Sequence, residues 1–584
     1  MGDQNGLRLI LWDREQSVRI VAAADVPEAE RFAAEQLRDY LGRMAGRPFD
    51  LAETPCSDSP AIIVGRSACA AEGFVPEGML TDDGFVIVST PKRLFITGDH
   101  PRGTLYGVYE FLEECLGCRF FSPEVERVPA YPEMTLEPVN IRRVPELEYR
   151  SSSVFQLRDP LYGAKRRING RERQDDAKTG GRVAYGEGYF VHTFCRHLLP
   201  PEQYFDAHPE YYSEIDGVRI REKTQLCLTN PEVLRLVTEQ VLSDIRSQPE
   251  ARIFSVSQDD NYNGCTCAAC RAVDEEEGSQ AGSLLRFVNA VAEAVEKEFP
   301  EVIIDTLAYQ YTRRPPRFVR ARRNVCVRLC TIECCFLHPL SECTADDPDA
   351  PRKDYAQSFR DDLIGWGEKC ERLYIWDYVT NFSHFWMPHP NLRVLAENIR
   401  FFRDHHVRGL FEQGCGAQGG GEMNDLRAYL LGRAMWNPDT DSERDRAEFL
   451  SAVYGSAAPY IDTYLETVYR AVAESGSHLY CFNHPDKPWH TLALTEKCEA
   501  LFEQAKAAAD NAEILRRVRF QEMAVRYLRI LLTPKGSPER NALIDRFAPD
   551  MKEFGITMLW ERADADICLS ILKGECSPGY WWPN

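Results

Sequence analysis

The chain has 584 residues, of which 44% are hydrophobic and 27% charged, and its formal net charge at pH 7 is −21. A chain of this length is too long to fold around a single hydrophobic core and should form two to four domains. The negative charge argues against a nucleic-acid or anionic-membrane partner, because phosphate binding depends on clustered Lys and Arg. The small basic clusters, Lys165 to Arg167 and Arg320 to Arg323, have acidic neighbours, and we interpret them as solvated faces.

The N-terminal segment Met1 to Gly6 lacks a basic stretch followed by a long apolar core, so the sequence shows no signal peptide. No window approaches about eighteen uninterrupted apolar residues, so we expect no transmembrane helix. The 20 cysteines are spread over a large chain, unlike a small disulfide scaffold. We therefore expect a cytoplasmic protein with reduced thiols, although a trimmed secreted protein would look the same. A homo-oligomer is compatible with these features.

Residues 1–140 have the pattern of a small α+β accessory domain. Helical periodicity covers residues 27–44 and 102–115, and a hairpin is expected between the last two strands. The Pro-rich stretch 129–145 indicates a linker and an edge strand. The predicted strands are 7–12, 18–21, 61–65, 84–88 and 93–98.

Residues 146–435 alternate between strand-like and helical segments, which predicts βαβ units and a parallel sheet. Seven or eight repeats suit a (β/α)8 barrel better than an open doubly wound sheet. Gly419 to Gly421 lacks the spacing of a phosphate-binding loop, so no nucleotide cofactor is expected. The candidate strands are 147–151, 188–193, 252–257, 302–309, 325–332, 372–376 and 409–411.

Residues 440–584 become helical, with apolar residues recurring every three or four positions. This periodicity predicts a helical bundle packed on the barrel. We expect the aromatic end, Gly579 to Asn584, to pack into a groove, with an aromatic platform for sugar as the alternative. The fold class is therefore α/β, a TIM-like barrel with an N-terminal α+β domain and a C-terminal helical region. The predicted helical segments are 442–454, 459–475, 495–532 with a break, and 538–554.

The segment Ile253 to Cys270 carries the strongest functional signal. A buried strand ends at Gln258, Asp259, Asp260 and Asn261, which precede a glycine and three cysteines. Carboxylates at the end of a buried strand lie where α/β barrels place their catalytic residues. A turn with Asx caps is the structural alternative.

Polar and aromatic side chains also follow the other predicted strands. Glycoside hydrolysis needs an acid to protonate the leaving oxygen and a second group at the anomeric carbon. Aromatic rings stack on the apolar faces of sugars. Structural roles remain open, since Glu333 could pair with Arg328 and Asp377 could cap a helix. The candidate site residues are His192, Asp259, Asp260, Asn261, Tyr309, Glu333, Trp376, Asp377, Tyr378, Glu412 and Gln413.

Cys265, Cys267 and Cys270 are close enough in sequence to bind a metal. No clear second cysteine pair is present, so we expect packed reduced thiols rather than zinc, with a disulfide as a third alternative. Because these residues follow Asp259 and Asp260, we predict that Cys267→Ser reduces stability and activity together without changing substrate preference. The fourth ligand of a metal site would come from Cys326, Cys330, Cys334, Cys335 or Cys343.

Several motifs resemble known carbohydrate-active proteins. Residues Arg102 to Leu112 and Gly117 to Pro123 resemble the accessory domain that precedes the barrel in β-hexosaminidases and α-glucuronidases. His208 to Tyr212, Gln225 to Pro231 and Asp260 with its cysteine cluster resemble the domain of unknown function 4838. That domain underlies glycoside hydrolase family 163, endo-β-N-acetylglucosaminidases that act on complex N-glycans.

The resemblance implies a retaining, substrate-assisted enzyme that acts on a glycan at β-linked N-acetylglucosamine. In related hexosaminidases an Asp orients the substrate acetamido group and an adjacent Glu is the acid. This chain has Asp259 and Asp260 instead of an Asp-Glu pair, so Glu333 is nominated as the acid. Asp260 would then orient the amide or share proton transfer.

Two alternatives stay open. The first is an inverting α-glucuronidase-like hydrolase, in which Asp377 and Glu412 activate water. It requires a cationic pocket, for which Arg313, Arg314 or Arg328 would have to reach the site. The second is a carbohydrate-binding protein that has kept the fold and lost the chemistry.

Overall fold

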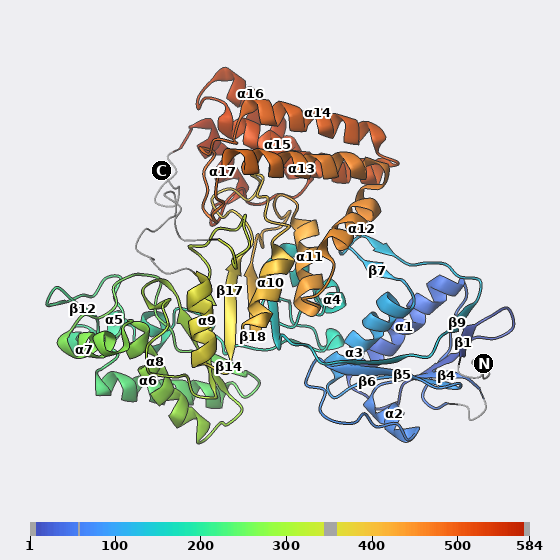
Figure 1. Cartoon of the computed structure of the whole chain (residues 1–584), viewed down its shortest axis with the longest axis horizontal. Coiled ribbons are helices and arrows are strands. Elements are labelled where there is room, and N and C mark those ends of the chain that lie inside the picture. The colour runs from blue at the N-terminus through green and yellow to red at the C-terminus, as the bar shows by residue number, and fades with distance from the viewer. Residues whose placement is uncertain (1–7, 56–58, 344–358, 577–584) are drawn as a thin grey trace.

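The structure, a computed structural model, describes residues 8–55, 59–343 and 359–576. Their helices and strands form three groups (Figure 1), with the C-terminal helices at the top, the N-terminal sheet at lower right and the central parallel sheet between them. The N-terminal group has its own apolar core, whereas the central sheet and the C-terminal helices share one continuous core. The predicted aromatic end, Gly579 to Asn584, lies outside the described residues.

The N-terminal group is built on a six-stranded mixed sheet in which β2, β4 and β6 are parallel and β5 is antiparallel to β6. Helices α1 (Glu28–Ala45) and α3 (Pro101–Glu110) lie over one face and α2 (Arg66–Ala71) over the other (Figure 1). Two small sheets, β1 (Leu9–Trp12) with β9 (Met134–Leu136) and β7 (Arg119–Phe120) with β8 (Glu126–Arg127), complete the group. The sheet order is β10 (Asn140–Arg143), β5 (Phe85–Ser89), β6 (Arg93–Gly98), β4 (Ala61–Val64), β2 (Arg19–Val21), β3 (Leu51–Ala52).

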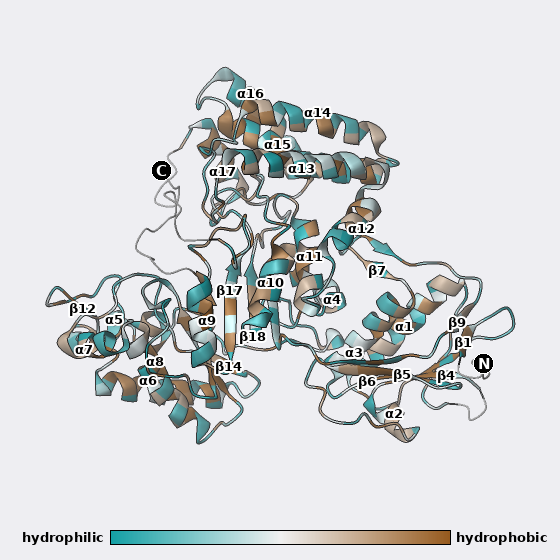
Figure 2. Ribbon diagram, in the orientation of Figure 1, coloured by the Kyte–Doolittle hydropathy of each residue, from teal (hydrophilic) through white to brown (hydrophobic). Residues whose placement is uncertain are grey.

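The central sheet contains six parallel strands. Its first strand in sequence pairs with its last, as in a barrel wall that curves back on itself. Figure 2 shows apolar residues concentrated on the strands and polar residues on the outer faces of the helices. The order is β11 (Tyr149–Ser152), β18 (Val407–Gln413), β17 (Leu373–Tyr378), β16 (Val325–Cys330), β15 (Ile303–Ala308), β14 (Ile253–Ser255).

The parallel half-barrel is consistent with the predicted TIM-like fold, and six of the seven candidate strands are present among the described residues, but segment 188–193 is not a strand. Tyr185 forms only an isolated parallel bridge with Ile253, and the N–H of Ser255 donates to the Tyr189 carbonyl at 3.0 Å. The φ angles of Gly188 (78°) and His192 (56°) are left-handed, which interrupts the extended backbone that a ladder requires. The wall between β14 and β11 is therefore irregular backbone.

Helices cover the central sheet and continue into the C-terminal region. In α6 the Asn230 side chain caps the N–H groups of Glu232 and Val233, and Pro231 occupies the first turn. The helices of the sheet are α6 (Pro231–Ser247), α7 (Ala268–Glu277), α8 (Ala281–Glu296), α9 (Phe359–Lys369), α10 (Leu395–Asp404) and α11 (Asn424–Trp436). The C-terminal helices are α12 (Ser442–Tyr454), α13 (Ala458–Ser475), α14 (Leu492–Ala508), α15 (Ala512–Leu532), α16 (Pro538–Glu553) and α17 (Ala565–Lys573).

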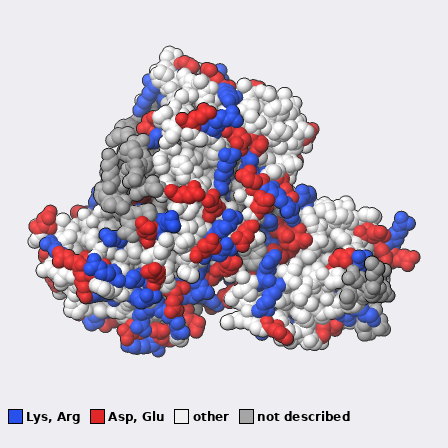
Figure 3. Space-filling model, viewed as in Figure 1, with Lys and Arg blue, Asp and Glu red and all other residues white. Residues whose placement is uncertain are grey.

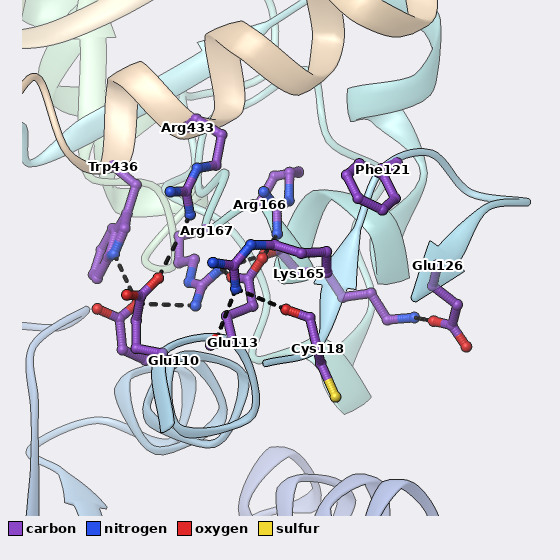
Figure 4. A network of polar contacts seen from close by, with 12 residues as sticks. Glu110, Glu113, Cys118, Phe121, Glu126, Lys165, Arg166, Arg167, Arg433 and Trp436 are labelled. Atoms are coloured by element: carbon purple, nitrogen blue, oxygen red, sulfur yellow. Dashed lines mark hydrogen bonds and ion pairs between the residues drawn. The ribbon is translucent and has the colours of Figure 1, made fainter. Parts of the chain in front are cut away.

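The basic cluster at 165–167 is not the solvated face that the sequence suggested. Arg166 and Arg167 are buried, both pair with Glu113, and Arg167 also binds Glu110 at 3.0 Å (Figure 4). Burial alone would raise the pKa of Glu113, but the two guanidinium groups lower it to about 2. These carboxylates, which lie on α3 and the π-helical turn after it, compensate the desolvation of the arginines. The network joins the N-terminal group to the central sheet.

A second buried ion cluster lies at the same interface. Asp83 pairs with Arg150 and, at 2.5 Å, with Arg102, which belongs to the accessory-domain motif. Asn169 donates to the same carboxylate. Elsewhere on the face shown in Figure 3, basic and acidic side chains are interspersed. Among the described residues, no helix is long and apolar enough to cross a membrane.

Candidate active site

A cavity of about 470 Å³ lies at the carboxyl ends of the central strands. This is the edge at which α/β barrels carry their active sites. Segments of the C-terminal helical region form its other wall. The lining residues are Val191, His192, Arg196, Asp260, Leu307, Tyr309, Cys330, Ile332, Trp376, Tyr378, Phe382, Ser383, Gln413, Phe482, Trp560, Glu561 and Arg562.

Six of the predicted site residues line this cavity: His192, Asp260, Tyr309, Trp376, Tyr378 and Gln413. Five of them lie at or after the ends of four strands and His192 lies in the irregular segment 188–193, so the structure brings together side chains that are more than 200 residues apart in sequence. The other five predicted residues, Asp259, Asn261, Glu333, Asp377 and Glu412, are not among the lining residues.

Asp377 and Glu412 face away from the cavity because successive residues of a strand point to opposite sides of a sheet. Trp376 and Tyr378 line the cavity, so Asp377 between them points to the other face, where it is paired in register with Glu412. Both carboxyl groups are buried, and burial raises the pKa of Asp377 to about 6 and that of Glu412 well above its usual value. The predicted role of this pair in activating water does not fit this placement.

Asp259 and Asn261 hold the loop rather than line the cavity. The buried Asp259 carboxylate accepts a hydrogen bond from the N–H of Cys195 at 2.8 Å, and burial raises its pKa to about 6. Asn261 donates to the Thr224 carbonyl and accepts from the N–H of Asn263, which is the Asx turn considered as the structural alternative.

Glu333 lies next to Arg313, with 3.5 Å between Oε2 and Nη1, and both side chains are buried. The suggested pairing of Glu333 with Arg328 is wrong, because Arg328 instead binds Asp305 at 2.7 Å. Arg328 lies beneath the cavity, 5.1 Å from the centre of the Trp376 ring. None of the three arginines expected from the sequence, Arg313, Arg314 and Arg328, is among the residues that line the cavity.

Asp260 is the cavity carboxylate that the sequence identified. Its Oδ1 accepts hydrogen bonds from the Tyr309 hydroxyl at 3.1 Å and from Nε2 of Gln310 at 3.2 Å. Gln310 has a left-handed φ of 53°, an uncommon conformation for a residue with a side chain. Two donors on one oxygen set the direction in which the carboxylate faces the cavity.

His192 lies beside Asp260 in the cavity wall. Its Nδ1 is 2.8 Å from the Gln258 carbonyl oxygen, so Nδ1 carries the hydrogen and Nε2 is left as the acceptor. Burial lowers the pKa of His192, with a smaller opposing effect of Asp260. A neutral imidazole at this position can accept a hydrogen bond from a substrate hydroxyl.

An aromatic wall forms one side of the cavity. The indole N–H of Trp376 donates to Oε1 of Gln413 at 2.7 Å, which fixes the ring plane. The Tyr378 ring is 6.4 Å from that of Trp376 at an angle of 25°, and its other edge contacts Phe382. Phe482 packs on Phe382 in turn. Rings held in this way suit the apolar faces of a sugar.

Three further charged lining residues, Arg196, Glu561 and Arg562, were missed by the sequence reasoning, and the last two follow α16 in the helical region. The N–H of Glu561 donates to the Phe382 carbonyl at 2.9 Å, and the N–H of Phe385 donates to the Leu559 carbonyl. These bonds attach segment 559–562 to the loop after β17. Burial raises the pKa of Glu561, Arg562 lowers it and the charge of Asp260 raises it, so the two carboxylates act on each other.

Two groups of possible metal ligands lie close to the site. Cys265, Cys267 and Cys270 meet Cys227, which was not among the expected fourth ligands. Four other side chains, Cys335, His338, Cys343 and His478, form a second group.

Two protein-family models match the chain. Residues 120–466 match the model described as "Domain of unknown function (DUF4838)", which is more than half of the 584 residues. The chain belongs to the DUF4838 family. Residues 12–111 of this DUF4838 protein match the model described as "Glycosyl hydrolase family 67 N-terminus".

Two fungal proteins, each named "Probable alpha-glucuronidase A", are similar to the DUF4838 protein over 85 residues. The one from Aspergillus fumigatus is 38% identical and the one from Neosartorya fischeri 35%. The match covers 14% of this chain and only 10% of each relative's length.

A solved structure, described as "A novel family GH115 4-O-Methyl-alpha-glucuronidase, BtGH115A, with specificity for decorated arabinogalactans", has a similar fold. Its TM-score is 0.56 at 12% identity, covering 94% of this chain and 77% of that chain. With the two family matches, this likeness makes the DUF4838 protein glycoside hydrolase-like. The resemblance to family 163 stays a prediction.

Proposed function

We propose that the DUF4838 protein is a glycoside hydrolase that releases a uronic acid residue from a glycan. The observation that carries this proposal is the composition of the cavity, which combines an aromatic wall with two carboxylates and two arginines. Aromatic rings and paired carboxylates suit glycoside hydrolysis in general. The arginines add a reason for an anionic sugar.

Arg196 and Arg562 are the lining residues with a fixed positive charge. Guanidinium groups bind carboxylates through short, charge-assisted hydrogen bonds, often two at a time. In this proposal they hold the C6 carboxylate of the sugar ring. The fungal relatives and the GH115 structure, which are all named as α-glucuronidases, support the same substrate class.

Glu561 is the proposed general acid. Its pKa is raised mainly by burial and further by the charge of Asp260, so it keeps its proton at a higher pH than an ordinary glutamic acid. Asp260, fixed by Tyr309 and Gln310, is the proposed partner that acts at the anomeric carbon or on the attacking water. His192 and Gln413 are placed to bind sugar hydroxyls.

The N-acetylglucosamine specificity expected from the sequence has no support from the two family models or from these relatives. Asp259, which would complete an amide-orienting pair, is buried and engaged with the N–H of Cys195. That specificity therefore stays a prediction, and it is the competing outcome when substrates are compared.

The test compares aryl α-glucuronides, 4-O-methyl-glucuronyl oligosaccharides, matched aryl α-glucosides and aryl β-N-acetylglucosaminides as substrates. We expect turnover of the uronides, with the glucosides much poorer because they lack the carboxylate. Arg562→Ala should raise KM for uronides and leave the slow glucoside reaction almost unchanged. Cleavage of the N-acetylglucosaminides alone, or of no glycoside, would contradict the proposal.

The catalytic assignment is tested with three conservative variants. Asp260→Asn and Glu561→Gln should each lower kcat by about 10²–10⁴-fold, the usual contribution of general acid–base catalysis. Glu333→Gln should keep a near wild-type kcat, because Glu333 pairs with Arg313 rather than lining the cavity. The reverse pattern would return the acid role to Glu333, as the sequence predicted.

A further inference from the structure

Four buried cysteines from two separate segments meet beside the loop that carries Asp260. Cys227 precedes α6, Cys265 and Cys267 follow β14, and Cys270 lies in the first turn of α7. Each side chain is at most 8% exposed, and the four together form a cluster of their own.

The distances between the sulfurs are those of a tetrahedral metal site. Each of the four Sγ atoms lies within 4.8 Å of the others, and Cys227 Sγ is 3.7 Å from that of Cys267 and 3.9 Å from that of Cys270. Four thiolates bound to zinc at about 2.3 Å are about 3.8 Å apart. Sulfurs of a disulfide would be about 2.05 Å apart.

Hydrogen-bond donors surround the sulfurs. The N–H of Glu214 lies 3.4 Å and Nη1 of Arg219 3.6 Å from the sulfur of Cys265, and the hydroxyl of Thr229 lies 3.2 Å from that of Cys270. A metal bound by four thiolates has a net negative charge, which N–H donors and a guanidinium group stabilise. Packed neutral thiols would not need such donors.

We propose that Cys227, Cys265, Cys267 and Cys270 bind one structural zinc ion. Four protein ligands leave no position for substrate or water, which is typical of a structural site. Soft thiolate donors in a tetrahedral arrangement select zinc over harder cations, with iron as the alternative. The expectation of packed thiols depended on the lack of a further cysteine near the cluster, and Cys227 fills that place.

The zinc would join two segments that shape the active site. Gln225 lies two residues before Cys227. Its side chain accepts a hydrogen bond from the N–H of Asp259 and donates hydrogen bonds to the carbonyls of Asp259 and Asn261. Asp260 lies between those two residues, and Cys265 follows five residues later. The metal would thereby hold the segment of Gln225 and Cys227 against the segment that carries Asp260, and so position the Asp260 carboxylate.

The second group of side chains carries an independent proposal. Cys335 Sγ is 3.4 Å from Nδ1 of His338, and Cys343 Sγ is 3.7 Å from Nδ1 of His478. Sulfur and nitrogen ligands of tetrahedral zinc are about 3.6 Å apart. The N–H of Leu337 also donates to the Cys335 sulfur. The geometry points to a second zinc ion that ties the loop after β16 to the helical region.

Both proposals are tested by measuring the zinc content of the protein by mass spectrometry of the metal. The protein is full-length and untagged, and it is purified without chelators or added zinc. We expect two equivalents per chain. Cys267→Ser should lose one equivalent and Cys343→Ser the other. Cys69→Ser, which replaces a buried thiol that contacts the Ile63 carbonyl in the N-terminal group, is the matched control and should keep both.

If the wild-type protein holds only one equivalent of zinc and Cys267→Ser alone loses it, the second proposal is overturned. If Cys343→Ser alone loses that single equivalent, the first proposal is overturned. Stoichiometric iron in place of zinc would overturn the metal assignment. Because a ligand variant can fail to fold, the wild-type protein is also exchanged with cobalt(II). Intense thiolate-to-cobalt absorption supports the four-cysteine site, and its absence together with a lack of zinc would overturn both.

Discussion

The Tyr309 hydroxyl donates a hydrogen bond to Oδ1 of Asp260 at 3.1 Å, inside the cavity. Tyr309→Phe removes this donor and leaves Nε2 of Gln310 as the other donor to that oxygen. We expect kcat to fall by roughly 10-fold or more, because a misdirected carboxylate spends less time in the reactive position. The free energy of unfolding should change by only about 1 kcal/mol, the net value of one hydrogen bond. Steady-state kinetics with urea denaturation checks both, and an unchanged kcat would remove Asp260 from the chemistry.

The activity should fall as pH rises through the pKa of Glu561, because the proposed acid must be protonated. Arg562 lowers that pKa, so Arg562→Gln should raise it and move the descending limb of the kcat–pH profile to higher pH. The measurement is kcat at saturating uronide across the pH range for wild type and variant. A limb that moves to lower pH, or does not move, would show that another group is the acid.

The burial of Asp377 and Glu412 should make the protein less stable as pH rises above about 4. Burial raises the pKa of Asp377 to about 6 and that of Glu412 further above its usual value. A carboxyl group with a raised folded-state pKa contributes stability below its unfolded pKa, and the contribution is lost as pH rises through the folded value. The free energy of unfolding should therefore decline from about pH 4, near the unfolded pKa values, up through the folded pKa values of the two groups. Glu412→Gln cannot ionise, so the free energy of unfolding should decline less steeply with pH than in wild type.

Asp83 should be important for docking the N-terminal domain. Asp83→Asn leaves the buried guanidinium groups of Arg102 and Arg150 without a counter-charge, which typically costs about 3–5 kcal/mol. Glu137→Gln, at an exposed ion pair with Arg8, is the control and should cost less than about 1 kcal/mol. Chemical denaturation of both variants is the measurement, and equal costs would contradict the prediction.

The contribution of Asp83 to stability should depend on pH, because of its ion pairs with Arg102 and Arg150. Burial would raise the pKa of Asp83, but the charges of Arg102 and Arg150 lower it to about 2. A carboxylate with a depressed folded-state pKa stabilises the protein above its unfolded pKa, near 4, and loses this effect as pH falls towards 2. The difference in stability between wild type and Asp83→Asn should therefore shrink in that acidic range.

Local sequence patterns were enough to identify the strands that build the site and several of the residues at their ends. Asp260 and Tyr309 could be found because they follow buried apolar strands, and Trp376 because it lies near the end of one. The alternation of side chains could also have separated Trp376 and Tyr378 from Asp377, because neighbouring residues of a strand face opposite sides. Such patterns can be read from the sequence because they depend on residues within one strand.

The distant segments that complete the sites could be recognised only in the folded molecule. Glu561 reaches the cavity through backbone bonds to the loop after β17, and Cys227 meets Cys265 across an intervening helix and strand. The missing strand at 188–193 is likewise set by left-handed residues that a hydrophobic pattern does not reveal. Such contacts follow from how helices and strands pack together, and packing between segments far apart in the chain leaves no periodic signal in the sequence.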